Sequence, residues 1–284
     1  LETGLGGRLD ATNVIDKSLI DIITPIGIDH QDFLGKNILK ITNEKLGIIK
    51  KNSNVIISKQ KSNIRLHIKK KLKKNKNDKI FFDIDYKITG QNNNSFHIHY
   101  KDKKIKFSKP KLIGDHQLEN ASTAIASILK LGELDYKFSI KKINAGIVKT
   151  TWPGRLETGS IGNIKVFLDG AHNLDGAVQI AKYFKNKKIK VWVVIGMLNN
   201  KDIHGFLKKI KPILKGVIAT SIPHEKNSLK TEEIIKVCKK LKLTCYEKTS
   251  ILKVNNFLLK KIRPKNVLIT GSLYFVGKIR NKYL

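Results

Sequence analysis

Cysteine and long apolar runs are both scarce in this chain of 284 residues, and each shortage excludes a class of protein. Two cysteines, Cys238 and Cys245, match neither a disulfide framework nor a metal cluster, so a reducing, cytoplasmic compartment is expected. The apolar runs are too short and too often interrupted by charge to span a membrane, which predicts a soluble protein without a membrane partner. With 40% hydrophobic residues, the chain can bury a real core and has room for two domains.

Acidic residues are also few: 23 Asp and Glu stand against 56 Lys and Arg, which gives a formal net charge of +33. Such an excess is typical of proteins that bind nucleic acid. Here the basic residues are mostly lysines spread along the whole chain. In the one dense cluster, 67–76, the spacing of Ile64, Ile68 and Leu72 is helical, so the lysines form a solvated helix face. We expect no nucleic-acid partner, and a basic nucleic-acid-binding module remains the alternative.

A phosphate-binding loop is missing as well, because no G-x-x-x-x-G-K-[ST] motif occurs in the 284 residues. The chain begins with Leu1 rather than Met, and no signal segment precedes the glycine-rich motif with which it opens. These observations predict an N-terminally incomplete protein that is inactive alone. A remnant that still folds but has lost its catalytic activity is a second alternative.

That opening motif, residues 1–13, is the segment most typical of a functional site. Glycines at positions 4, 6 and 7 allow the backbone to turn tightly or to approach a ligand closely. Glu2 and Asp10 offer hard oxygen ligands, and Arg8 offers a fork of hydrogen-bond donors.

The first half of the chain mixes parallel and antiparallel patterns. A nearly continuous apolar run from Ser18 to Ile28 predicts a buried parallel strand, which ends at Asp29 and His30. Polar residues at such strand ends are where open α/β sheets bind ligands. The other elements expected here are a strand at 55–58, an antiparallel patch from 82–88, 96–100 and 105–107, and helices at 37–49, 115–131 and 139–148.

The order of predicted elements changes after Trp152, Pro153 and Gly154, which we expect to form a hinge. From there strands and helices alternate strictly, as in a doubly wound sheet. The expected strands are 164–168, 189–195, 216–219, 243–246 and 267–270, with helices from 173, near 202–212, near 231–241 and before the last strand.

One lysine of the 37–49 helix is misplaced, because Lys45 lies on the apolar seam that Ile38, Ile41 and Ile48 mark. Burial without a partner lowers the pKa of a lysine, and a neutral amine can add carbon dioxide to give a carbamate, an anionic metal ligand. On spacing alone, a lysine whose stem covers the core while its ammonium reaches water is the better interpretation.

A second polar cluster, residues 169–173, follows the first strand of the second half and opens a helix with Asn173 as its cap. This position suits an anion or a nucleotide, and Arg155 on the hinge could reach the same cleft. On its own, the segment from Asp115 to Asn120 indicates only the start of a helix.

Seven segments, taken in order, carry a family resemblance: 2–13, Ile28-Asp29-His30 with Phe33-Leu34-Gly35, 44–50, His116-Gln117 with Asn120-Ala121, 152–157, 169–173 and 271–274. They resemble folylpolyglutamate synthase and its bifunctional form with dihydrofolate synthase, in the Mur ligase superfamily. The resemblance implies an α/β fold in which residues 1–151 are the C-terminal portion of a P-loop ATPase domain of the Mur ligase type, and 152–284 a Rossmann-like domain. It places the phosphate loop and the early pterin-binding elements upstream of Leu1.

The resemblance also implies roles for individual residues. Glu2 and His30 would be magnesium ligands, and Lys45 would carry the carbamate that contributes to a second metal site. His172 and Ser272 would lie near the incoming glutamate and complete the catalytic set with Lys45. The remaining residues would bind substrates, Arg8, Leu9 and Asp10 in the pterin-side pocket and Asn120, Arg155 and Asp169 at ATP. A minor departure from the family pattern is Thr3, where a small aliphatic residue is usual.

The activity implied is the ATP-dependent addition of L-glutamate to folates through an acyl phosphate, together with dihydrofolate synthesis from dihydropteroate and glutamate. ATP would be the co-substrate, two Mg²⁺ ions the cofactors, and the enzyme a cytoplasmic monomer.

Overall fold

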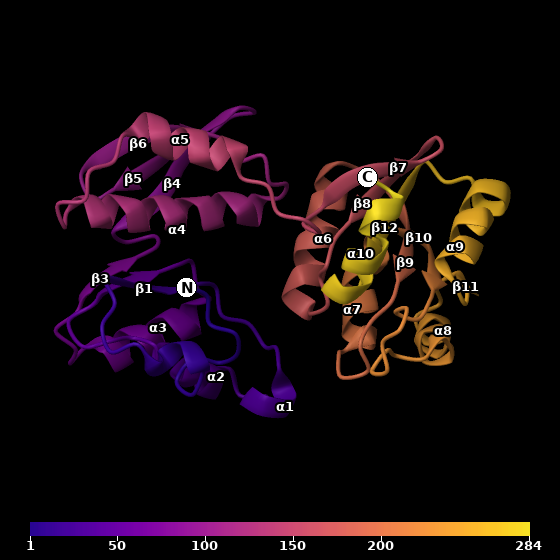
Figure 1. Cartoon of the computed structure of the whole chain (residues 1–284), viewed down its shortest axis with the longest axis horizontal. Helices are drawn as coiled ribbons and strands as arrows, with labels where there is room; N and C mark the ends of the chain where they lie inside the picture. The colour runs from indigo at the N-terminus through magenta and orange to yellow at the C-terminus, as the bar shows by residue number, and fades with distance from the viewer. The chain divides into compact units, whose positions relative to one another are not determined.

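The computed structural model describes every residue from Leu1 to Leu284. The chain divides into two compact units, one formed by residues 1–111 and 115–150 and the other by residues 112–114 and 151–284. Each unit has hydrophobic clusters of its own. Figure 1 shows the helices and strands of the chain. None of the helices has both the length and the apolar composition needed to cross a bilayer.

A three-stranded parallel sheet lies at the centre of the first unit, in the order β1 (Ile20–Ile23), β2 (Asn54–Ile57), β3 (Asp78–Phe81). Helices α2 (Ile38–Leu46) and α3 (Ser62–Leu72) cover one of its faces. The first strand is shorter than the apolar run predicted, because Pro25 has no N–H to donate to a sheet.

A second, antiparallel sheet forms the rest of this unit, with strands β4 (Tyr86–Gln91), β5 (Ser95–Tyr100) and β6 (Lys103–Ser108). Alternate residues of β5 enter a core shared with the other face of the parallel sheet. The long helix α4 (Asp115–Gly132) and helix α5 (Ile140–Lys149) complete that core (Figure 1). His97 and His99 lie on the opposite, half-exposed side of β5.

The prediction of one continuous strand pattern over 82–88 was wrong. The chain leaves β3 at Phe81 and turns before β4 begins at Tyr86, so the two strands belong to different sheets. Within the turn, Asp83 has a left-handed φ of 68°, and the Asp85 carboxylate accepts the Phe81 N–H at 2.7 Å. A side chain that bonds the backbone locally ends the strand even though the apolar alternation continues.

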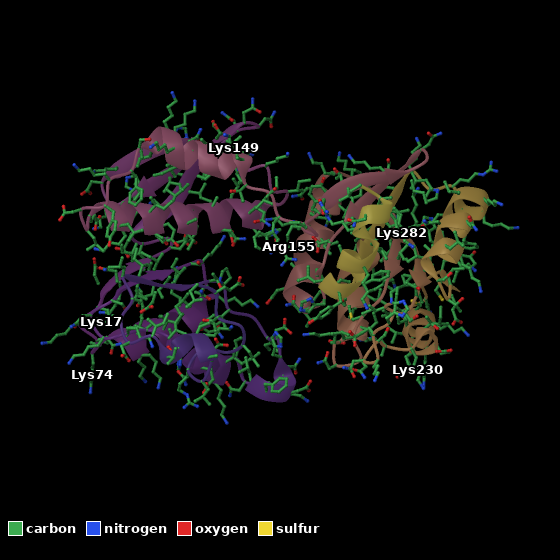
Figure 2. All side chains as sticks on the ribbon, in the orientation of Figure 1. Lys17, Lys74, Lys149, Arg155, Lys230 and Lys282 are labelled. Carbon is green, nitrogen blue, oxygen red and sulfur yellow. The ribbon has the colours of Figure 1, made fainter.

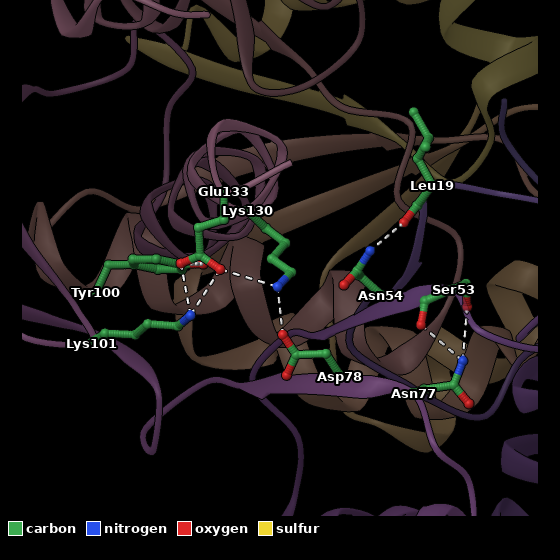
Figure 3. A network of polar contacts seen from close by, with 9 residues as sticks. All are labelled: Leu19, Ser53, Asn54, Asn77, Asp78, Tyr100, Lys101, Lys130 and Glu133. Atoms are coloured by element: carbon green, nitrogen blue, oxygen red, sulfur yellow. Dashed lines mark hydrogen bonds and ion pairs between the residues drawn. The ribbon is translucent and has the colours of Figure 1, made fainter. Parts of the chain in front are cut away.

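A buried lysine ties together both sheets and α4 of this unit (Figure 3). The Lys130 ammonium donates to Asp78 of β3 at 2.5 Å and to Glu133 at 3.0 Å. Glu133 also accepts hydrogen bonds from the Tyr100 hydroxyl and from Lys101 beside β5. The hydrogen bond from Lys130 holds the pKa of Asp78 below its ordinary value. Burial favours a higher pKa for Glu133, but the hydrogen bonds from Lys101 and Lys130 outweigh it and lower that pKa.

The second unit is a doubly wound sheet, as predicted. Its six strands lie in the order β11-β10-β9-β12-β8-β7. They are β7 (Glu157–Ile161), β8 (Ile164–Leu168), β9 (Val191–Ile195), β10 (Leu214–Ala219), β11 (Cys245–Glu247) and β12 (Asn266–Thr270). Only the first of them, β7, runs antiparallel to its neighbour. It was missed because its sequence Glu-Thr-Gly-Ser-Ile has little apolar content.

Helices cover both faces of this sheet (Figure 1). One face packs against helices α6 (Leu174–Asn186), α7 (Ile203–Ile210) and α8 (Thr231–Lys240). The other packs against helices α9 (Ile251–Phe257) and α10 (Leu273–Ile279). The four inner strands, β8, β9, β10 and β12, are largely buried, whereas the edge strands β7 and β11 are partly exposed.

Basic side chains are distributed over both units (Figure 2). The labelled lysines lie far apart along the chain and are all solvent-exposed: Lys17, Lys74, Lys149, Lys230 and Lys282. On α3, Ile64, Ile68 and Leu72 are buried while the lysines beside them are exposed, which confirms the solvated helix face.

We expect Lys130→Met to destabilise the first unit by about 1 to 3 kcal/mol, because Asp78 and Glu133 would lose their shared cation. A fully buried pair would cost more, but these two carboxylates remain partly in water. Amide hydrogen exchange of α4 and β3 would measure the loss.

The exposed Lys74→Met change removes the same charge and serves as the control. Since both carboxylates have lowered pKa values, they stabilise the folded state above their ordinary pKa and lose that effect as the pH falls through the folded-state values. The difference between the Lys130 variant and the wild type should therefore shrink toward about pH 3. An equal difference in stability between the two proteins at neutral pH and at about pH 3 would contradict this account.

Candidate active site

The glycine-rich opening motif packs against α2. A Cβ atom on Gly7 would lie 2.6 Å from the Glu44 carbonyl oxygen and 3.1 Å from the Lys45 Cα. The Arg8 N–H donates to that Glu44 carbonyl at 2.8 Å, and the Arg8 guanidinium pairs with the Glu44 carboxylate at 3.1 Å. The motif and the helix that carries Lys45 are thus brought into contact, and the close approach that Gly7 allows is to this helix.

Asp10 holds the loop of the motif in shape. Its carboxylate accepts hydrogen bonds from the Thr12 hydroxyl at 2.6 Å, the Leu5 N–H at 2.8 Å and the Thr12 N–H at 3.0 Å. These bonds stabilise the carboxylate and lower the pKa of Asp10 to about 2. Leu9 beside it is exposed. Arg8 and Asp10 make these contacts with other residues of the first unit. The role of Arg8, Leu9 and Asp10 in a pterin-side pocket stays a prediction.

Two candidate metal ligands, Glu2 and His30, are solvent-exposed. His30 precedes the short helix α1 (Gln31–Leu34) and has a left-handed φ of 51°, which is uncommon outside glycine. No three His, Cys, Asp or Glu side chains gather closely enough to hold a metal ion by themselves. Magnesium usually takes only one or two protein ligands and fills its other positions with water and phosphate oxygens. A carboxylate and an imidazole open to solvent fit that requirement, and the assignment stays a prediction.

The third candidate, Lys45, is half-buried on α2. Ile41 is buried, and Ile38 and Ile48 pack against the same cluster, so the apolar seam expected around this lysine is present. The carbamate on Lys45 stays a prediction.

Asn120 lies near the start of α4, close to the carboxyl end of β2. The link is an ion pair of 2.8 Å between Lys59, which follows β2, and Glu119 on α4. The Asn120 side-chain NH₂ group donates to the Gln117 side-chain oxygen Oε1 at 3.1 Å, which leaves the Asn120 side-chain oxygen as the acceptor for a partner. Its role as an ATP contact stays a prediction.

In the second unit, the predicted site residues gather where the sheet reverses its winding. Strands β8 and β12 are neighbours, and the helices that follow them, α6 and α10, cover opposite faces. The crevice at the carboxyl ends of two such strands is where open α/β sheets bind ligands. Segment 169–173 forms the loop after β8, and segment 271–274 leads from β12 into the first residues of α10. Both belong to the segments that carry the family resemblance.

Asp169 is almost fully buried in that crevice, with 8% of its surface exposed. Its carboxylate accepts the Ala171 N–H and the Leu156 N–H, each at 2.9 Å. Burial raises the pKa of Asp169, although these two bonds and the charges of Arg155 and His172 oppose the shift. Both oxygens therefore already serve the loops, and contact with ATP stays a prediction.

His172 and Ser272 are also placed by their loops. The His172 Nδ1 lies 3.0 Å from the Gly170 carbonyl oxygen, so Nδ1 carries the proton in the neutral ring and Nε2 is the basic nitrogen. Ser272 is buried, and its hydroxyl accepts the Tyr274 N–H as the cap of α10. Their place near the incoming glutamate stays a prediction.

Sequence reasoning assigned no role to Glu157 and Arg280, yet they form a forked ion pair in the second unit. The Arg280 guanidinium donates to both carboxylate oxygens, at distances from 2.6 to 3.1 Å. Glu157 belongs to a segment that the family resemblance already included, but nothing in the sequence connects it to a residue 123 positions away.

Two family models match the two parts of the chain. The Mur ligase middle domain matches residues 7–128, and the C-terminal domain of dihydrofolate synthetase matches residues 155–282. With the parallel sheet of the first unit and the doubly wound sheet of the second, these matches define a ligase of the Mur type.

Similarity to individual proteins identifies the family within this class of ligases. The chain is 30% identical over 292 residues to the probable dihydrofolate synthetase of Schizosaccharomyces pombe, an alignment covering 98% of this chain and 69% of that protein. It is 30% identical over 291 residues to dihydrofolate synthase/folylpolyglutamate synthase of Bacillus subtilis, covering 99% and 66%. The chain therefore belongs to the dihydrofolate synthase/folylpolyglutamate synthase family of ATP-dependent carbon–nitrogen ligases.

A solved structure agrees with this assignment. Mycobacterium tuberculosis folylpolyglutamate synthase complexed with ADP and AMPPCP superimposes with a TM-score of 0.84 at 25% identity, over 99% of this chain and 67% of that one. The chain thus spans about two thirds of the length of the relatives it matches.

We expect Asp10→Ala to loosen the opening loop, because three hydrogen bonds to the carboxylate disappear together. The Leu5 and Thr12 amides should exchange hydrogen at least about tenfold faster, while amides of β2 keep their protection. The nearby exposed change Asp16→Ala is the control. Unchanged exchange at Leu5 would show that the carboxylate does not hold the loop.

Proposed function

We propose that the protein containing this chain adds L-glutamate to folates and also forms dihydrofolate from dihydropteroate and glutamate. The observation that supports this most is the alignment of nearly the whole chain with synthases of both names at 30% identity. The structural match to a synthase complexed with ADP and AMPPCP supports ATP as the co-substrate.

The chemistry joins two unreactive partners in two steps. A folate carboxylate oxygen attacks the γ-phosphorus of ATP, ADP leaves, and an acyl phosphate forms. The glutamate amine, after losing a proton, then attacks the acyl carbon, and phosphate leaves from the tetrahedral intermediate. Both steps concentrate negative charge, which cationic side chains and magnesium stabilise.

In this proposal, Glu2 and His30 hold magnesium, and Lys45 carries a carbamate that serves a second ion. Magnesium would offset the charge of the transferring phosphoryl group. The basic Nε2 of His172 would accept the proton of the glutamate ammonium, which must be lost before the amine can attack. Ser272 would help to bind that glutamate.

We also propose that residues 1–151 and 152–284 are the two domains of this chain. Asn120, Arg155 and Asp169 would contact ATP, and Arg8, Leu9 and Asp10 would line the pterin-side pocket. The orientation of Asn120 supports this, because its free oxygen can accept a hydrogen bond from an amino group such as that of adenine.

We further propose a cytoplasmic monomer that binds neither nucleic acid nor membrane. Both cysteines are free thiols, which fits a reducing compartment. The lysines are spread over both units, whereas nucleic-acid-binding proteins gather them in one stripe or patch (Figure 2).

A ligase assay of the full protein tests the proposal. ADP release should require a folate, L-glutamate and Mg²⁺ together, and mass spectrometry should show one glutamate added for each ADP formed. Replacing the folate with dihydropteroate tests dihydrofolate synthesis separately. If the folded protein releases no ADP in response to glutamate, the chain is better explained as a remnant that has lost its catalytic activity. If it binds DNA tightly and this binding weakens steeply with salt, the nucleic-acid-binding module is favoured.

We expect Lys45→Ala in the full protein to lower turnover by orders of magnitude, because the carbamate could no longer form. Short carboxylic acids should restore part of the activity by supplying an anionic oxygen. Lys40→Ala, an exposed change on the same helix, is the control. Full activity of the Lys45 variant, or an unmodified lysine in the active enzyme by native mass spectrometry in bicarbonate, would rule out the carbamate.

A further inference from the structure

An ion pair distant in sequence holds the backbone on which Arg155 lies. Arg280 follows α10 directly, and Glu157 is the first residue of β7. The Arg280 Nε donates to the two carboxylate oxygens at 3.1 and 2.9 Å, and its Nη2 donates to one of them at 2.6 Å. This fork fixes the orientation of the carboxylate as well as its position.

The oriented carboxylate has a second partner. The Glu157 Oε2 accepts the N–H of Gly154 at 3.0 Å, and the Gly154 carbonyl accepts the N–H of Gly170 at 2.9 Å. Gly154 has a left-handed φ of 68°. Both polar groups of the residue directly before Arg155 are therefore held.

The residue directly after Arg155 is held in a similar way. Leu156 has a left-handed φ of 48°, which is strained for a residue that carries a Cβ atom. Its N–H donates to the buried Asp169 carboxylate at 2.9 Å. Such a conformation persists only where the surroundings fix it. The carboxylates of Glu157 and Asp169 thus hold the backbone N–H groups of the residues before and after Arg155.

The guanidinium of Arg155 is not used for this purpose. Its one hydrogen bond is a long contact of 3.5 Å from Nη1 to the neighbouring Gly154 carbonyl. Arg155 is thus a cation with a fixed backbone and a side chain that remains available to a ligand.

We propose that Arg280 is a positioning residue for Arg155, acting through the Glu157 carboxylate and the Gly154 N–H. The inference rests on the proposed function, in which Arg155 contacts ATP. Arg280 sets the direction in which Arg155 leaves the backbone, and thereby the affinity for ATP. Its effect should not extend to the affinity for folate.

The contacts around Arg280 make it a fixed anchor. The Tyr283 carbonyl accepts the N–H of Ser160 on β7 at 3.0 Å, and the buried Tyr283 hydroxyl donates to Asn255 at 2.7 Å. The segment after α10 is therefore held to β7 through Ser160 and to α9 through Asn255.

The test measures KM and kcat of the full protein for ATP and for folate, together with ADP binding. We expect Arg280→Gln to raise the KM for ATP and the Kd of ADP by about tenfold, while the KM for folate changes less than about twofold. Arg280→Lys keeps the charge but loses the fork, so it should restore only part of the affinity. Lys282→Gln removes a nearby exposed charge and should change neither constant.

A charge-swapped double variant separates positioning from stability. In Glu157→Arg with Arg280→Glu the ion pair can form again, but the Gly154 N–H loses its acceptor. We expect thermal stability to recover while the affinity for ATP stays low. Recovery of both, or an unchanged affinity for ATP in Arg280→Gln, would show that the pair only stabilises the fold.

Arg155→Gln distinguishes the failure of this inference from that of the proposed function. If Arg155→Gln lowers the affinity for ATP and Arg280→Gln does not, the positioning role alone is wrong. If Arg155→Gln leaves ATP binding unchanged, the ATP contact itself is wrong, and the inference fails with it.

Discussion

Carboxylates that accept backbone N–H groups hold the loops of the candidate site in this protein. Asp10 fixes the opening motif, Asp169 fixes the crevice of the second unit, and Glu157 fixes the peptide before Arg155. Asp21 of β1 has the same role for the loop before β2, where its carboxylate accepts hydrogen bonds from the Lys50 N–H and the Ser53 hydroxyl. In a chain with 56 basic and 23 acidic residues, several of the few acids are therefore committed to loop geometry.

This arrangement follows from the position of ligand sites in α/β folds. The chain turns sharply where a parallel strand ends, and a buried turn leaves backbone N–H groups that need acceptors. A carboxylate can accept several of them at once and forms stronger bonds than a neutral acceptor. The Asp169 carboxylate bridges two loops in this way. Burial raises its pKa, and those bonds together with the charges of Arg155 and His172 offset only part of that shift.

The net charge does not dominate the structure, because most lysines are exposed and lie apart from one another. Where a lysine is buried, it has a specific function in packing. Lys130 neutralises Asp78 and Glu133, and so joins two sheets and a helix of the first unit. The difference between Lys130 and the exposed lysines of α3 lies in burial and partners, which the composition does not reveal.

Most regular elements could be predicted from the sequence, because burial imposes a period on apolar residues. The strand at 164–168 and the capped helix after Asn173 were predicted at their observed positions. The errors occurred where a local hydrogen bond or a neighbouring strand outweighs the pattern. Asp85 ends β3 within an alternating run, and β7 is held by pairing with β8 although it has little apolar content.

For the site, the sequence by itself determined the residue types and their order: the glycine motif, Lys45 on an apolar seam, the segment 169–173 and Arg155. These are local patterns, and their chemistry is evident from composition and spacing. Only the tertiary structure decided that Gly7 packs against the helix of Lys45, that β12 lies beside β8, and that Arg280 reaches Glu157. Such contacts join residues far apart in the chain, and they depend on strand order and helix packing rather than on any local sequence.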